Sequence, residues 1–163
     1  MGTVNGTFSV GLVASHSVSS DLTSPNDLIN LLFSETYASG TGSNQVNESW
    51  IDTRTVTAAP ETLDLDSGVL INRFGETLTL SKVRVLIIRN KATTTGHILS
   101  LTGDFLIGLS ITDNSPIQVV APGGLLVMTS PIDGITVGVG ADDLTVNPGV
   151  NTISYDIAIL GVT

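Results

Sequence analysis

The chain has 163 residues, no cysteine, six Lys and Arg against fifteen Asp and Glu, and a formal net charge of −9. The lack of cysteine excludes disulfides, thiolate metal sites and thiol nucleophiles, and so few basic residues argue against nucleic acid as a partner. Charged residues make up 13% of the chain, against about 25% in an ordinary soluble domain. This length predicts one domain, with or without an arm.

The first segment, residues 3–14, alternates between apolar and small polar side chains. This period of two predicts a strand, or an arm that becomes a strand by pairing with a neighbouring chain. Edge strands are normally protected by charge or proline, and this segment has neither. We therefore assign residues 1–20 to an N-terminal strand or arm used in assembly, and residues 21–163 to one sandwich domain. The side chains expected to make the assembly contact are Val4, Phe8, Val10 and Leu12.

The same N-terminus lacks a basic region followed by an apolar core, so no export signal is expected. No run of residues approaches the roughly 18–20 apolar residues of a membrane helix, so no membrane partner is expected either.

Residues 28–37 are compatible with two structures. Leu28, Leu31 and Leu32 have helical spacing behind a capping sequence, whereas Ile29, Leu31 and Phe33 alternate as in a strand. We favour the strand because every neighbouring segment has strand periodicity.

The strongest strand pattern lies in residues 76–90, and a second clean pattern closes the chain at residues 152–160. In the first, Lys82 and Arg84 fall on one side of an extended chain and three apolar residues on the other. In the second, apolar side chains alternate with polar ones. The core residues predicted from the two strands are Val83, Val85, Ile87, Ile153, Tyr155 and Ile157.

Short strands recur along the rest of the chain, with Gly, Pro and Asn turns between them. This spacing, with no convincing long helix, predicts an all-β fold. We expect an antiparallel β-sandwich of the jelly-roll or Greek-key type.

Residues with catalytic chemistry are few. His16 and His97 have no serine or carboxylate motif around them, so nucleophilic catalysis is not expected. Asp64 and Asp66 share one face of a short strand, but no calcium-loop spacing accompanies them or the Asp142-Asp143 pair. We therefore predict a non-enzymatic protein with no metal and no cofactor.

Segments of the sequence taken together resemble a group of small virion structural proteins of tailed bacteriophages. The resemblance covers residues 20–163 and depends on the order and spacing of the segments. They are G-T-G-S-N-Q-V-N-E-S-W-I-D-T-R-T-V (40–56), E-T-L-D-L (61–65), F-G-E-T-L-T-L-S-K-V-R-V-L-I-I-R-N (74–90), P-G-G-L-L-V-M-T-S-P (122–131) and T-I-S-Y-D-I-A-I-L-G (152–161).

The resemblance implies a capsid decoration, or cement, protein that forms a homo-oligomer, expected to be a trimer, on the major capsid protein. Such a protein is assembled in the host cytoplasm and lies on the capsid exterior, where a net charge of −9 is better suited than beside DNA. The group has no catalytic residues to carry over. One alternative is a tail or fibre component that binds a receptor or glycan, which would need Tyr37 and Trp50 exposed. A glycan-degrading enzyme using Asp64 or Asp143 is disfavoured, because no acid/base pair is evident.

Overall fold

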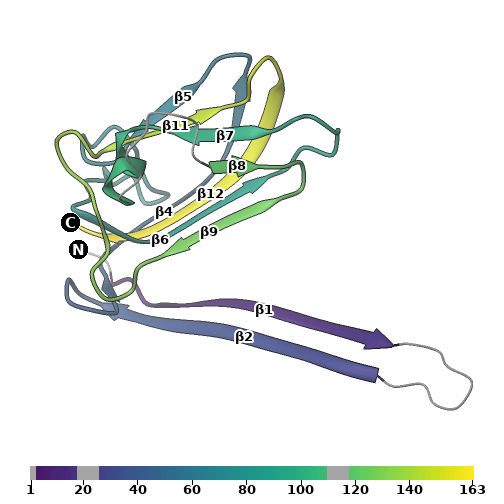
Figure 1. Ribbon diagram of the computed structural model, residues 1–163. Coiled ribbons are helices and arrows are strands. Elements are labelled where there is room, and N and C mark those ends of the chain that lie inside the picture. The colour runs from purple at the N-terminus through teal and green to yellow at the C-terminus, as the bar shows by residue number, and fades with distance from the viewer. Residues whose placement is uncertain (1–2, 18–25, 110–117) are drawn as a thin grey trace, which may run out of the picture.

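The computed structural model of the protein describes residues 3–17, 26–109 and 118–163. They form a sandwich of two β-sheets and a long two-stranded arm that leaves one end of the sandwich and runs beneath it (Figure 1). The predicted all-β sandwich is confirmed. In the described part of the chain, no helix is long and apolar enough to cross a membrane, and a 3₁₀ helix, η1, spans Asp104–Leu109.

The sandwich consists of two antiparallel sheets. The first has the order β4–β12–β6–β9, with a short further strand on the β9 side of β6. Its members are β4 (Glu48–Thr57), β12 (Thr152–Val162), β6 (Lys82–Asn90), β9 (Leu125–Thr129) and β10 (Ile135–Thr136). The second sheet consists of β5 (Glu61–Asp64), β11 (Asp143–Asn147), β7 (Leu99–Thr102) and β8 (Gln118–Val120), in that order.

The chain crosses repeatedly from one sheet to the other. The first-sheet strands β4, β6, β9 and β12 alternate along the sequence with β5, the β7–β8 pair and β11 of the second sheet. This alternation, with the strand orders β4–β12–β6–β9 and β5–β11–β7–β8, is the eight-stranded jelly-roll arrangement, to which the two-residue strand β10 is an addition. Of the two topologies expected from the sequence, the structure has the jelly roll.

The main core fills the space between the two sheets. Strand β12 contributes Ile153, Tyr155 and Ile157, all buried there as expected from their alternation. The Tyr155 hydroxyl donates a hydrogen bond to Glu61 Oε2 at 3.0 Å, and Glu61 Oε1 accepts one from Arg54 Nε at 2.9 Å. The polar end of a buried tyrosine is thus satisfied, as it needs to be in an apolar interior.

In the central strand β6, the alternation of side chains between the two sides of the sheet differs from the alternation expected from the sequence. Its pairing with β12 passes from Leu160↔Val85 to Gly161↔Val83, so Arg84 has no partner and forms a bulge. A bulge shifts the alternation by one residue. Consequently Val83 lies in the main core with Leu86 and Ile88, whereas Val85 belongs to a separate cluster.

Ile87 lies on the same outer side of the first sheet as Val85 and is only half-buried. The expectation that Val83, Val85 and Ile87 share one buried face is therefore corrected. Strict alternation fails at the bulge, and Leu86 takes the central position that the sequence suggested for Ile87.

The arm is formed by β1 (Gly6–Ser17) and β2 (Asn26–Ser39), paired antiparallel along their length from Gly6↔Tyr37 to Ser17↔Asn26. At its root, the end of β2 pairs in parallel with the two-residue strand β3 (Gln45–Val46). The second strand of the arm lies within residues 21–163, which the sequence assigned to the sandwich. The arm therefore extends beyond residues 1–20, because it is a hairpin and not a single segment.

Candidate assembly surface

The root of the arm packs on the outer side of the first sheet. Tyr37, Val46 and Val85 are buried together there, and Val4, Phe8, Ile87 and Leu160 pack around them. Gly6 is the partner of Tyr37, so Phe8, two residues further along β1, lies on the same face of the ribbon as Tyr37. This cluster fixes which face of the arm is turned toward the sheet at the root.

A buried arginine at the bulge of β6 joins the root to two loops. Arg84 donates from Nη1 to the carbonyl oxygen of Ile132 at 2.5 Å and from Nη2 to that of Gly42 at 3.1 Å. Beside it, the Asn44 amide donates to the carbonyl of Pro131 at 2.8 Å. Hydrogen bonds from a charged donor are stronger than neutral ones. Arg84 therefore fastens the loop after β2 to the loop after β9 and holds the arm to the sandwich.

Beyond the root, the arm has large apolar side chains in contact with water. We call the side that bears Phe8 and Tyr37 the first face of the arm. Further out on this face are Val10, Leu12, Ile29, Leu31 and Phe33, which are all exposed. Val10 is the partner of Phe33, and Leu12 that of Leu31. The first face is therefore an apolar strip that continues outward from the packed root.

The opposite side, which we call the second face, is polar near the root and apolar further out. Near the root, the hydroxyl groups of Ser9 and Ser34 are 3.1 Å apart across the ribbon. Further along, Val13, Leu28 and Leu32 are exposed. Each face of the arm thus presents apolar surface to solvent.

The four residues expected to act in assembly divide into two pairs. Val4 and Phe8 are half-buried in the root cluster of their own chain, whereas Val10 and Leu12 are exposed. Sequence reasoning missed the β2 residues opposite them. The available signal was the alternation of Ile29, Leu31 and Phe33, which matches that of residues 3–14 and is separated from it by a polar stretch.

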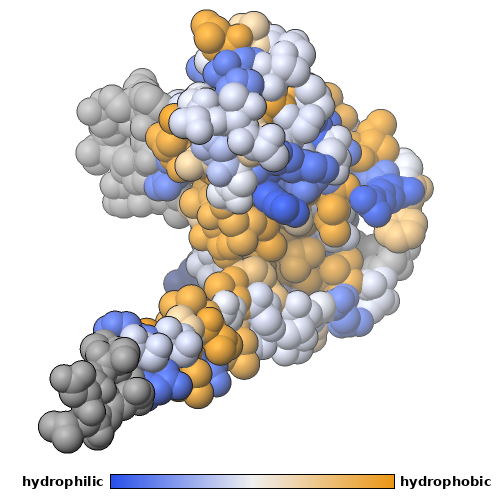
Figure 2. Space-filling model, turned by 90° about the vertical axis from the view of Figure 1, so that its right-hand side faces the viewer, coloured by the Kyte–Doolittle hydropathy of each residue, from blue (hydrophilic) through white to orange (hydrophobic). Residues whose placement is uncertain are grey.

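The outer side of the first sheet carries an apolar row next to the root cluster. Register places the four members of this row side by side across the sheet: Ile51, Ala158, Ile87 and Val127. Ile51 is 51% exposed and the other three are half-buried. Figure 2 shows a hollow between the arm and the sandwich, with hydrophobic surface on both sides of it.

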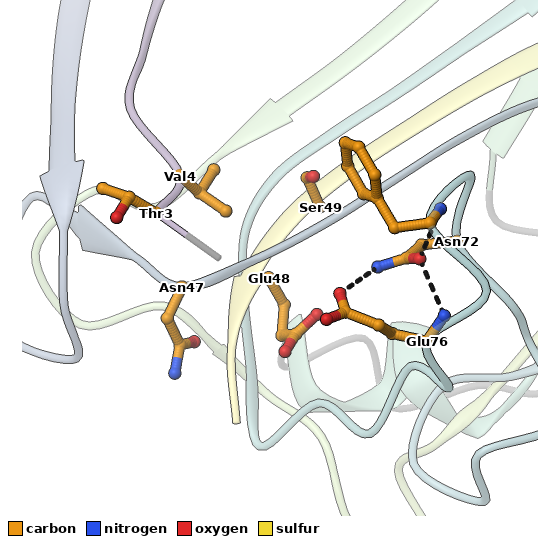
Figure 3. Close-up of a pocket in the computed structure, with 8 residues that line it drawn as sticks. Thr3, Val4, Asn47, Glu48, Ser49, Asn72 and Glu76 are labelled. Atoms are coloured by element: carbon orange, nitrogen blue, oxygen red, sulfur yellow. Dashed lines mark hydrogen bonds between the residues drawn. The ribbon is translucent and has the colours of Figure 1, made fainter. Parts of the chain in front are cut away.

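A groove of about 410 Å³ lies beside the root (Figure 3). Its lining comes from the segment before β1, from β3–β4 and from the loop after β5: Thr3, Val4, Asn47, Glu48, Ser49, Asn72, Phe74 and Glu76. The Asn72 side chain organises the loop by donating to Glu76 Oε2 and accepting from the Glu76 amide, both at 3.0 Å. Burial, followed by the charge of Glu76, raises the pKa of Glu48. The groove thus combines two like charges with small polar groups.

Carboxylates that are far apart in the sequence meet at the end of β5. Oxygens of Asp64, Asp66 and Asp142 lie within 4.8 Å of one another. Desolvation, followed by the charges of Asp142 and Asp64, raises the pKa of Asp66. Exposed acidic groups often gather in this way without a metal, so the arrangement alone does not define a cation site. The absence of a metal requirement stays a prediction.

The two aromatic residues that a glycan-binding surface would need are buried. Tyr37 is 1% exposed and Trp50 is 3% exposed; Trp50 Nε1 donates to the carbonyl of Ile71 at 3.2 Å. The two histidines, for which the sequence predicted no catalytic role, are far apart in the chain: His16 lies near the outer end of β1 and His97 in the turn before β7.

Comparisons with family models, curated proteins and solved structures found no match.

Proposed function

We propose that this protein is a non-enzymatic structural protein of a virion, a capsid decoration protein that attaches to the outside of a phage head. The observation that carries the proposal is the arm, a long ribbon with exposed apolar side chains on both faces. A surface of this kind is typical of a site that another protein covers.

The length of the arm supports an assembly role. Strand β1 has 12 residues, which correspond to roughly 40 Å at the rise of an antiparallel strand. An isolated two-stranded ribbon is marginally stable in water, and further strands or packing are needed to hold it. Beyond the root cluster, the arm would gain that support from a neighbouring subunit.

Charge and resemblance support the location. A net charge of −9 disfavours contact with packaged DNA, and the order of the sequence segments resembles small virion proteins of tailed phages. The partners in this proposal are the major capsid protein and further copies of the chain, expected as a trimer. The receptor- or glycan-binding alternative is weakened because Tyr37 and Trp50 are buried.

Particle binding tests the proposal. Purified protein is mixed with heads of the encoding phage that lack it, and the copies bound are counted by quantitative mass spectrometry after sedimentation. Saturation at hundreds of copies per head is expected, and Val150→Asp, at an exposed turn residue, should bind equally well. Saturation at a handful of copies per head, or no binding to heads, would contradict the decoration role.

A further inference from the structure

The arm has apolar side chains on both faces, and this limits what can cover it. The first face carries five exposed apolar residues, and the second face carries Val13, Leu28 and Leu32. A ribbon that lies on one flat surface buries one face and leaves the other in water. Burial of both faces, which the hydrophobic effect favours, requires a site with two apolar walls.

The chain itself provides such a site in the hollow between the arm and the first sheet. One wall is the row of Ile51, Ala158, Ile87 and Val127 on the sheet. The other wall is the first face of the arm, whose inner end is turned toward the sheet by the packing of Phe8 and Tyr37. We call this two-walled hollow the slot; its opening and its hydrophobic surfaces are visible in Figure 2.

We propose that the arm of a second copy of this chain occupies the slot, so that copies are joined by exchanged arms. The exchanged arm would extend a contact that already exists within one chain. The root of the arm packs on Val85 and Leu160, and the next pair on the same side of the sheet is Ile87 and Ala158, which belong to the sheet row. The arm wall of the slot is itself a first face, so in a reciprocal exchange the first faces of the two arms meet, and the second face of each arm lies on the sheet row of the other copy. The inference rests on the assembly role proposed above and names the partner of the arm.

The apolar surface available is sufficient for such an interface. Eight exposed apolar side chains on one arm offer roughly 500 Å² between them. Two exchanged arms would bury about 1,000 Å², and the two sheet rows that receive them about half as much again, which is the size of a standard protein–protein interface.

Cross-linking between two single-cysteine chains tests the exchange directly, since the natural chain has no cysteine. A Leu32→Cys chain, with its cysteine on the second face of the arm, is mixed with an Ile51→Cys chain, with its cysteine on the sheet, and treated with a short bis-maleimide. We expect Leu32–Ile51 heterodimers to form several times faster than in the control mixture of Leu32→Cys with Val150→Cys. Val150 is 90% exposed and follows β11 in a turn.

Each other outcome of the cross-linking contradicts the proposal. If Leu32→Cys homodimers dominate, the second faces of the arms pack on each other and not on the sheet. If a Leu31→Cys/Ile51→Cys double variant cross-links within one chain, the arm folds onto its own sheet. A heterodimer rate equal to the control would mean that no second copy fills the slot, and that another protein such as the shell covers the arm.

A charge in the slot gives an independent measurement. Ile51→Glu should lower the solution mass of the protein to that of a monomer, because it places a carboxylate in the sheet wall. Thr57→Glu, exposed on the same side of the same strand, should leave the oligomer intact; an unchanged mass for Ile51→Glu would overturn the inference. Both tests use free protein, so they can fail while head binding survives, and the reverse also holds.

Discussion

Leu86 and Ile87 are neighbours on β6 that face opposite sides of the first sheet, and truncating each to alanine should have different costs. Leu86 is fully buried in the main core. Its three lost carbon atoms cost about 2.4 kcal/mol of transfer free energy, and the cavity raises the total to about 3–4 kcal/mol. In a single copy of the chain, measured at a concentration where it is monomeric, Ile87 is half-buried beside the hollow, where solvent can fill the space. Its truncation should cost only about 1 kcal/mol.

Urea denaturation at neutral pH measures the two costs, as the shift in midpoint multiplied by an unchanged slope. For a chain of this size, Leu86→Ala should also lower the Tm by about 6–16 °C and Ile87→Ala by about 2–4 °C. Val150→Ala, at an exposed turn residue, is the control and should be near neutral. If Ile87→Ala is as costly as Leu86→Ala, the bulge at Arg84 does not exist in solution and the assignment of faces on β6 is wrong.

Four further measurements follow from the structure. Arg84→Met keeps the aliphatic stem but loses both hydrogen bonds to loop carbonyls. It should lower the free energy of unfolding by about 2–4 kcal/mol and speed hydrogen exchange at the Asn44 amide. An exchange rate equal to that of the wild type at Asn44 would contradict the role of Arg84 in fastening the two loops. Gly161→Ala should destabilise by about 1–3 kcal/mol, because its Cβ would lie 2.5 Å from the Lys82 carbonyl oxygen; a wild-type Tm would show that the bulge accepts a side chain. The pKa of Glu48 is raised from 4.5, so its charged form is disfavoured in the folded state at pH above 4.5, and stability from this group rises as pH falls. Glu48→Gln should therefore raise the Tm at pH 7, with a gain that vanishes below pH 4.5; a gain independent of pH would refute this reasoning. Chelator treatment should leave the Tm unchanged, whereas a loss restored by calcium would assign a metal to the carboxylates at the end of β5.

The sequence by itself determined the fold class and the apolar character of the arm. Both depend on local patterns: the alternation of Ile153, Tyr155 and Ile157 in β12 identifies a buried strand whatever its partners are. The lack of charge or proline in residues 3–14 likewise marks an unprotected strand without any knowledge of the fold. Turn residues between short strands then predict a sandwich.

Tertiary structure alone decided which side of the sheet each residue of β6 faces. The bulge arises in the pairing with β12, where Gly161 allows the backbone of Lys82 to approach. Arg84 can be buried because two loop carbonyls accept hydrogen bonds from its guanidinium group, and these carbonyls lie 48 and 42 residues away in the sequence. No pattern within β6 contains that information.

The same reason applies to the arm and to the carboxylates. Residues 28–37 were compatible with a helix or a strand, and the strand that the sequence favoured is the one observed; its pairing with β1 made it the second half of the arm. Asp142 meets Asp64 and Asp66 because β11 pairs with β5. Long-range pairing of this kind depends on which strands the jelly roll brings together, and a sequence read locally does not define it.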